Sequence, residues 1–116
     1  MKTRAEAITV CADLPFVYED YPFDDDNWTL MRHKENSRTF ALIFEREGKI
    51  WINLKALPEN GFIMRELYPS VLPAYHMNKR NWVSVILDGS IPDETVKGFI
   101  EESYRLTAKK RKKSAE

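Results

Sequence analysis

Hydrophobic and polar residues alternate with a period of two through the middle of the chain, and this pattern predicts β-strands. Three strands are expected there, at Trp28 to His33, Thr39 to Glu45 and Lys49 to Lys55. Short polar segments at 34–37 and 46–48 separate them, and each contains residues that favour tight turns. The middle of the chain is therefore expected to form an antiparallel meander, with Phe40, Leu42 and Phe44 on one face of its second strand.

A helical period replaces the alternation at both ends of the chain. Thr3-Arg4-Ala5-Glu6 matches a capping box, so a helix is expected from about Thr3 to Asp13. Near the other end, Ser90-Ile91-Pro92-Asp93 opens a second helix, with acidic residues at its positive end. The expected buried residues are Ala5, Ile8, Cys11 and Ala12 in the first helix, and Val96, Phe99, Ile100 and Tyr104 in the second.

The remaining segments complete an α+β pattern. A short helix is expected from Pro58 to Tyr68, held to the sheet by Phe62, Ile63 and Leu67, and a further strand from Trp82 to Leu87. Pro69 and Pro73 bracket a stretch that can be neither regular helix nor central strand. The acidic segment 19–27 is expected to be a solvated loop. The predicted fold is an antiparallel sheet with the N- and C-terminal helices packed on one face.

Length and composition indicate one domain that buries a core. The chain has 116 residues, of which 43% are apolar, and the domain is expected to span residues 1–107. Residues 108–116 are expected to form a flexible basic tail. A single cysteine, Cys11, excludes an internal disulfide and a cysteine-rich zinc site. The N-terminus lacks the apolar core of a signal peptide, and no apolar run approaches the roughly 20 residues that span a bilayer. A cytoplasmic protein without a membrane partner is expected.

Charge is distributed unevenly although the formal net charge is zero. Residues 1–26 carry a net charge of −5, residues 27–65 carry +3 and residues 109–113 carry +5. A chain with this polarity can present a basic face despite its neutral total.

The sequence contains no recognisable catalytic motif. A nucleophile elbow, a P-loop and a glycine-rich nucleotide motif are all missing. His33 and His76 each lack a second histidine or cysteine at metal-ligand spacing. We therefore expect a protein that is not an enzyme, with no cofactor and no metal site.

The polar turn from His76 to Asn81 is the strongest candidate site. Lysine and arginine side chains neutralise phosphates, and amide and guanidinium groups can read base edges. The predicted nucleic-acid-binding residues are His76, Asn78, Lys79 and Arg80, with Arg38 and Lys55 at strand ends. The alternative is a solvated loop whose side chains satisfy turn backbone. Trp51 and Trp82 are either core residues or platforms for base stacking.

A resemblance to the MmcQ/YjbR family is carried by the stretch from Tyr75 to Tyr104, which reads YHMNKRNWVSVILDGSIPDETVKGFIEESY. Weaker similarities lie in the capped first helix, in Arg38-Thr39-Phe40-Ala41-Leu42 and in Ile52-Asn53-Leu54-Lys55. The chain has Arg38-Thr39-Phe40 where the family pattern has a lysine-led Lys-Met-Phe. The resemblance implies a fold like that of CyaY, the bacterial frataxin homologue, and a double-wing arrangement for DNA binding.

Three functions remain open at this stage. The first is weak, largely sequence-tolerant DNA binding, with duplex DNA as the expected partner, and the second is a protein-interaction or small-ligand-binding module. The third, by analogy with frataxin, is iron binding, which is disfavoured because the first helix has only Glu6 and Asp13 as acids and the others, such as Asp24 to Asp26, follow in a loop.

The basic tail generates a first prediction about salt dependence. If its five cations engage duplex phosphates, they contribute about −4 to −5 to the slope of log affinity against log salt. Deleting residues 109–113 should then flatten the slope in a titration of labelled duplex and leave residual binding. An unchanged slope would show that the tail does not contact phosphate.

Overall fold

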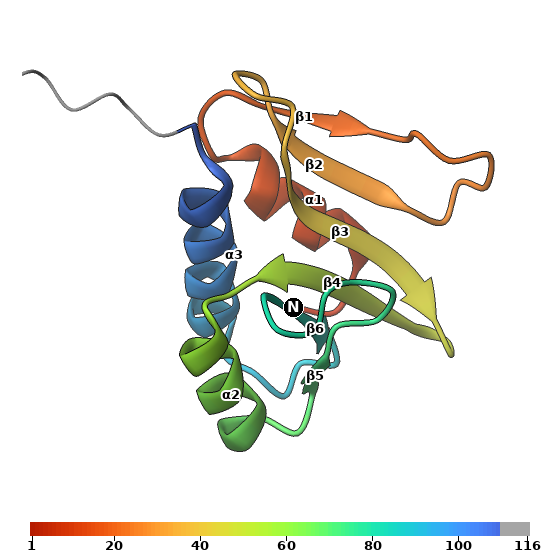
Figure 1. Cartoon of the computed structure of the whole chain (residues 1–116). Helices are drawn as coiled ribbons and strands as arrows, with labels where there is room; N and C mark the ends of the chain where they lie inside the picture. The colour runs from red at the N-terminus through yellow and green to blue at the C-terminus, as the bar shows by residue number, and fades with distance from the viewer. Residues whose placement is uncertain (110–116) are drawn as a thin grey trace, which may run out of the picture.

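Six antiparallel strands form one sheet, and three helices accompany them (Figure 1). The computed structural model describes residues 1–109, so the predicted tail lies almost wholly outside the described residues. In chain order the elements are α1 (Arg4–Ala12), β1 (Val17–Asp20), β2 (Thr29–His33), β3 (Thr39–Arg46), β4 (Lys49–Lys55), α2 (Pro58–Leu67), β5 (Val71–Pro73), β6 (Trp82–Ile86) and α3 (Asp93–Thr107). The strand order is β1-β2-β3-β4-β6-β5. The predicted α+β class is confirmed.

The helices α1 and α3 cover one face of this sheet, as predicted. Their buried residues join those of the central strands in one hydrophobic cluster, which includes Cys11, Ile43, Ile52, Val85 and Ile100. Ser103 fastens α3 to the sheet, since its buried hydroxyl donates to Phe40 O (2.6 Å) and accepts from Lys55 N (2.8 Å). Among residues 1–109 there is no helix that is both long and apolar enough to cross a membrane.

The turns follow the expected chemistry. Glu47 and Gly48 both have positive φ, at 54° and 74°, and link β3 to β4 by the tight hairpin that was predicted. The capping box at Thr3 is also present, with Glu6 N donating to the Thr3 hydroxyl.

The prediction for Phe40 was wrong because β3 contains a bulge. Met31 pairs with Ala41 while Arg32 pairs with Thr39, so Phe40 is the extra residue. The bulge breaks the alternation, and Phe40 packs with the helices, its ring 5.4 Å from that of Tyr104. Leu42 and Phe44 face the other side of the sheet.

The buried face of α1 is rotated from the predicted one. Ala7 and Cys11 are fully buried, whereas Ala5 and Ala12 are exposed. Ile8 is partly buried, and Val10 and Leu14 also pack at the margin of the core. Burial raises the pKa of the Cys11 thiol to about 12, so this cysteine stays protonated at neutral pH.

The predicted attachment of α2 was also wrong. Phe62, Ile63 and Leu67 are 57%, 51% and 64% exposed. The helix instead approaches the sheet through Gly61, where an added Cβ would lie 3.3 Å from Val83 Cγ1. The small residue sets the contact face, and the three large side chains therefore point outward.

Two segments contain strands that the sequence did not predict. Glu19 and Asp20 belong to β1, which pairs with β2, so the acidic loop begins only at Tyr21. The stretch between the prolines includes β5, a three-residue strand at the edge of the sheet. Its edge position agrees with the exclusion of a central strand there, because proline cannot donate a ladder hydrogen bond.

The burial of α3 generates a stability prediction. Ile100 is fully buried, so Ile100→Ala should lower the free energy of unfolding by about 2–5 kcal/mol. Phe99 is only partly buried, beside Tyr68, and its truncation should cost less than removal of an equally large core ring. Urea denaturation of both variants measures the two values. A larger loss for Phe99→Ala than for Ile100→Ala would contradict this assignment of the buried stripe.

Candidate functional site

The segment 74–81, which joins β5 to β6, lies on the sheet face opposite α1 and α3. We call it the covering loop. Figure 1 shows it in teal, in front of β4. Two hydrogen bonds hold its start: Tyr75 N donates to Ser84 Oγ (2.8 Å), and Asn53 Nδ2 donates to Tyr75 O (2.9 Å). A third bond joins the two anchoring side chains, since Ser84 Oγ donates to Asn53 Oδ1 (2.5 Å).

Asn53 and Ser84 form a cross-strand pair between β4 and β6, and both are fully buried. Two polar side chains in the middle of a sheet are costly unless their hydrogen bonds are satisfied. The backbone of Tyr75 supplies the missing partners. This polar pair thus determines where the covering loop crosses the sheet.

An aromatic layer forms the rest of this face. Trp28 stacks on Phe44 with ring centroids 4.2 Å apart, and Phe44 stacks on Tyr75 at 5.7 Å. The guanidinium of Arg46 lies 4.9 Å from the ring centre of Trp51 and 4.4 Å from that of Tyr75. Trp51 is therefore a core residue, in agreement with the simpler of its two interpretations.

The covering loop owes its shape to Asn78 and His76. Asn78 Oδ1 accepts hydrogen bonds from the backbone N–H groups of Arg80 (2.8 Å) and Asn81 (3.3 Å). His76 has a φ of 58°, in the left-handed region. The side-chain carbonyl of Asn78 thus stabilises the turn, as expected if the segment is a solvated loop. Lys79 and Arg80 are exposed.

A cationic cavity of about 500 Å³ lies beside this loop. Arg38 and Lys55 line it together with Met77 and Trp82. Lys55 and Trp82 are register partners, and Ser103 of α3 holds the Lys55 backbone. Within residues 1–109 the Arg38 and Lys55 side chains form no salt bridge, and no acidic residue lines the cavity.

Arg32 also lines the cationic cavity, but its charge is compensated. Its Nε donates to Asp20 Oδ2 at 2.7 Å, and its Nη1 donates to Ser37 O at 3.0 Å. The available positive charge in this cavity therefore comes from Arg38 and Lys55.

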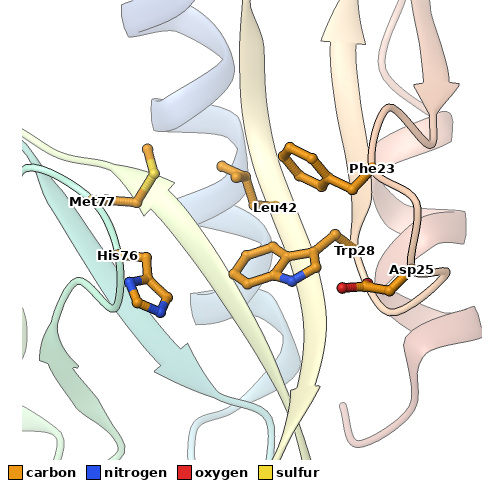
Figure 2. Close-up of a pocket in the computed structure, with 6 residues that line it drawn as sticks. All are labelled: Phe23, Asp25, Trp28, Leu42, His76 and Met77. Carbon is orange, nitrogen blue, oxygen red and sulfur yellow. The ribbon is translucent and has the colours of Figure 1, made fainter.

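An aromatic cavity of about 380 Å³ adjoins the cationic one, and the two share Leu42 and Met77. Figure 2 shows the Trp28 and His76 side chains extending toward each other from its two sides. Its lining residues are Phe23, Asp25, Trp28, Leu42, His76 and Met77.

The position of Trp28 depends on contacts of its neighbour Asn27. The Asn27 side chain donates to Glu45 O and accepts from Glu45 N, at 3.0 and 2.8 Å. Arg4 of α1 donates to Asn27 O (2.6 Å) and to Asn27 Oδ1 (3.0 Å). These contacts fix the end of the acidic loop on β3.

The predicted site residues therefore separate into three groups. Arg38 and Lys55, distant in sequence, line one cavity, and His76 lines the adjoining one. Asn78 shapes the loop. Lys79 and Arg80 are exposed on the loop and do not line either cavity.

The aromatic side of this site was not predicted from the sequence. Trp28 and Phe23 were assigned only to a strand and an acidic loop. An aromatic residue on either side of the aspartates was the one available signal. Met77 was noted only as part of the polar turn, although it lines both cavities.

His33 lies on the helix side and is buried. Its Nε2 is hydrogen-bonded to Thr107 Oγ1 at 2.9 Å, and burial lowers the pKa of its imidazole. The part of the chain that the structure describes contains no group of three histidine, cysteine, aspartate or glutamate residues arranged to hold a metal ion.

Fold and site define an α+β domain with helices on one face of the sheet. The other face carries the covering loop and the two adjoining cavities, which together we call the trough. Residues 12–106 match the YjbR family, and the chain belongs to this family. The resemblance noted in the sequence is thereby confirmed.

Relatives in two bacteria support this assignment. The chain is 33% identical to the uncharacterized protein YjbR of Escherichia coli K12 over 103 residues, 89% of this chain and 85% of that protein. It is 33% identical to the uncharacterized protein YyaQ of Bacillus subtilis over 99 residues, 76% of this chain and 83% of the relative.

Solved structures show the same fold. A protein of Deinococcus radiodurans with the family domain DUF419 superposes with a TM-score of 0.82 at 36% identity, covering 91% of this chain and 78% of that one. A protein of Pseudomonas syringae also gives 0.82, at 27% identity, covering 91% of this chain and 99% of that one.

The buried polar pair generates a prediction about the covering loop. Ser84→Ala removes a hydroxyl that bonds both Asn53 and Tyr75, so it should cost about 1–3 kcal/mol of stability. Amide hydrogen exchange at Tyr75 should accelerate more than the global loss explains. Thr9→Ala, at an exposed hydroxyl on α1, is the control and should leave that exchange unchanged. Normal protection of Tyr75 in Ser84→Ala would refute the anchoring role.

Proposed function

We infer that the protein binds DNA without catalysing a reaction, weakly and with little sequence preference, through the face that carries the covering loop. The observation that supports this most is the cationic cavity. Arg38 and Lys55 both line it, no acidic residue belongs to the lining, and Lys79 and Arg80 are exposed on the adjoining loop.

Each of these cations can neutralise a backbone phosphate and release a counterion. Phosphate contacts position a protein on DNA but carry no direct sequence information. In this arrangement Lys79 and Arg80 contact phosphate, Arg38 and Lys55 extend the basic surface, and His76 and the Asn78 amide N–H₂ group lie at the groove. The binding is therefore largely insensitive to sequence.

Weak binding follows from the charges around the site. Residues 1–108 carry a net charge of −4, and the exposed loop 21–26, which contains three aspartates, places Asp25 at the aromatic end of the same face. Their repulsion of phosphate opposes the attraction of the cations. We expect micromolar or weaker affinity at physiological salt.

A second candidate function is protein interaction through α2. Phe62, Ile63 and Leu67 are each more than half exposed on this helix. Exposed apolar groups that cluster are typical of interaction surfaces. This candidate takes precedence if the DNA test below is negative.

Charge reversal on the covering loop tests the DNA proposal. Lys79→Glu combined with Arg80→Glu should abolish the folded domain's salt-sensitive binding of a labelled duplex, measured by fluorescence anisotropy at low salt. Lys97→Glu with Arg105→Glu makes the same charge change on α3, on the other side of the sheet, and should retain the binding at this face. Equal losses in the two variants would indicate a non-specific charge effect and contradict the proposed interface.

A further inference from the structure

The two adjoining cavities together have a polarity that the DNA proposal does not use. One end is lined by Phe23, Trp28 and His76, and the other by the cations Arg38 and Lys55. Leu42 and Met77 line both cavities, which places the aromatic and cationic ends next to each other. Each volume, about 380 and 500 Å³, is within the range of about 300–1,000 Å³ that small-molecule sites occupy.

We propose that this trough binds one unpaired nucleotide, with the base between Trp28 and His76 and the phosphate at Arg38 and Lys55. The inference rests on the proposed nucleic-acid binding and deepens it. It assigns the ligand as a nucleoside monophosphate unit, supplied by a single strand or by a free nucleotide.

The aromatic end suits a base because its side chains come from two separate walls. Trp28 enters from the residue directly before β2, and His76 enters from the covering loop (Figure 2). Phe44 supports the indole from within the sheet at 4.2 Å. A flat ring that enters this cavity can stack on the indole, which Phe44 holds in place, and stacking of this kind tolerates every base. The imidazole of His76 lies beyond the edge of the indole and closes the cavity on the opposite side (Figure 2). In a duplex the base faces are already stacked, so they cannot enter.

The electrostatics orient the nucleotide in one direction. Asp25 lines the aromatic cavity and repels phosphate there, while its carboxylate can accept hydrogen bonds from base amino groups. Arg38 and Lys55 attract phosphate at the other end, and the Thr39 side chain in the same lining adds a hydroxyl donor. Because Asp20 compensates Arg32, Arg38 and Lys55 carry the phosphate contact.

The three tryptophans provide a local readout of this binding. Trp28 lines the aromatic cavity and Trp82 lines the cationic one, whereas the Trp51 indole N–H is bonded to Arg46 O at 3.1 Å. In two-dimensional NMR spectra of the full chain, a short single-stranded deoxyadenosine oligomer should shift the Trp28 and Trp82 indole signals. The Trp51 signal should move least.

Variants of both ends should separate the two contacts. Trp28→Leu removes the stacking platform and should weaken oligomer binding about fivefold to 150-fold, the equivalent of one lost base stack. Because Trp28 also packs on Phe44, a second variant is needed at this end. His76→Asn serves this purpose, because asparagine tolerates the left-handed backbone of His76.

Arg38→Gln with Lys55→Gln should lower affinity for deoxyadenosine monophosphate but not for deoxyadenosine. Lys97→Gln with Arg105→Gln on α3 is the matched control and should leave the Trp28 shifts unchanged.

The outcomes distinguish this inference from the function on which it rests. If a hairpin duplex shifts the amides of Lys79 and Arg80 while neither the oligomer nor deoxyadenosine monophosphate moves Trp28, the trough proposal fails and DNA binding stands. If no nucleic acid perturbs either region, both fail. Saturation by the monophosphate at the same concentration as by the strand would assign the site to a free nucleotide. Much tighter binding of the strand would assign it to a polymer.

Discussion

The face of the sheet away from the helices depends on one buried polar pair. Asn53 and Ser84 lie opposite each other on β4 and β6, without contact to water, and they bond each other and the backbone of Tyr75. A hydrophobic pair at these positions would leave the Tyr75 backbone N–H and C=O without these two partners. The covering loop, the Tyr75 ring and both cavities are placed by this satisfaction of hydrogen bonds, rather than by a second hydrophobic core.

The two faces of the sheet are consequently specialised. On the helix side, apolar side chains of α1, α3 and the central strands exclude water and account for the stability of the domain. On the other side, stacked aromatic rings support a surface whose two ends carry opposite charge. Ser103 connects the two, because it is buried in the helix layer yet bonds the backbone of Lys55, whose side chain lines the cationic cavity.

The acidic loop has a role in this arrangement that its composition does not show. Its end is held by Arg4 and by the reciprocal bonds between Asn27 and Glu45, so it forms a fixed wall of the aromatic cavity. The same loop brings negative charge next to a cationic surface. A ligand that carries its charge at one end and an uncharged ring at the other suits this polarity better than one that is charged throughout.

Local pattern determined most elements of this protein, whereas tertiary structure decided the two edge strands, β1 and β5, and how the elements meet. The capping box at Thr3, the Glu47-Gly48 hairpin and the alternation in β4 are short-range effects, so the sequence predicted the α+β class, the meander and the terminal helices. The bulge at Phe40, the approach of α2 through Gly61 and the rotation of α1 toward Ala7 depend on how neighbouring elements fit together.

The candidate site residues Arg38, Lys55 and His76 were recognisable from their chemistry. Their proximity to Trp28 was not, because it arises from the hydrogen bonds of Asn53, Ser84 and Asn27, whose partners lie up to 31 residues away along the chain.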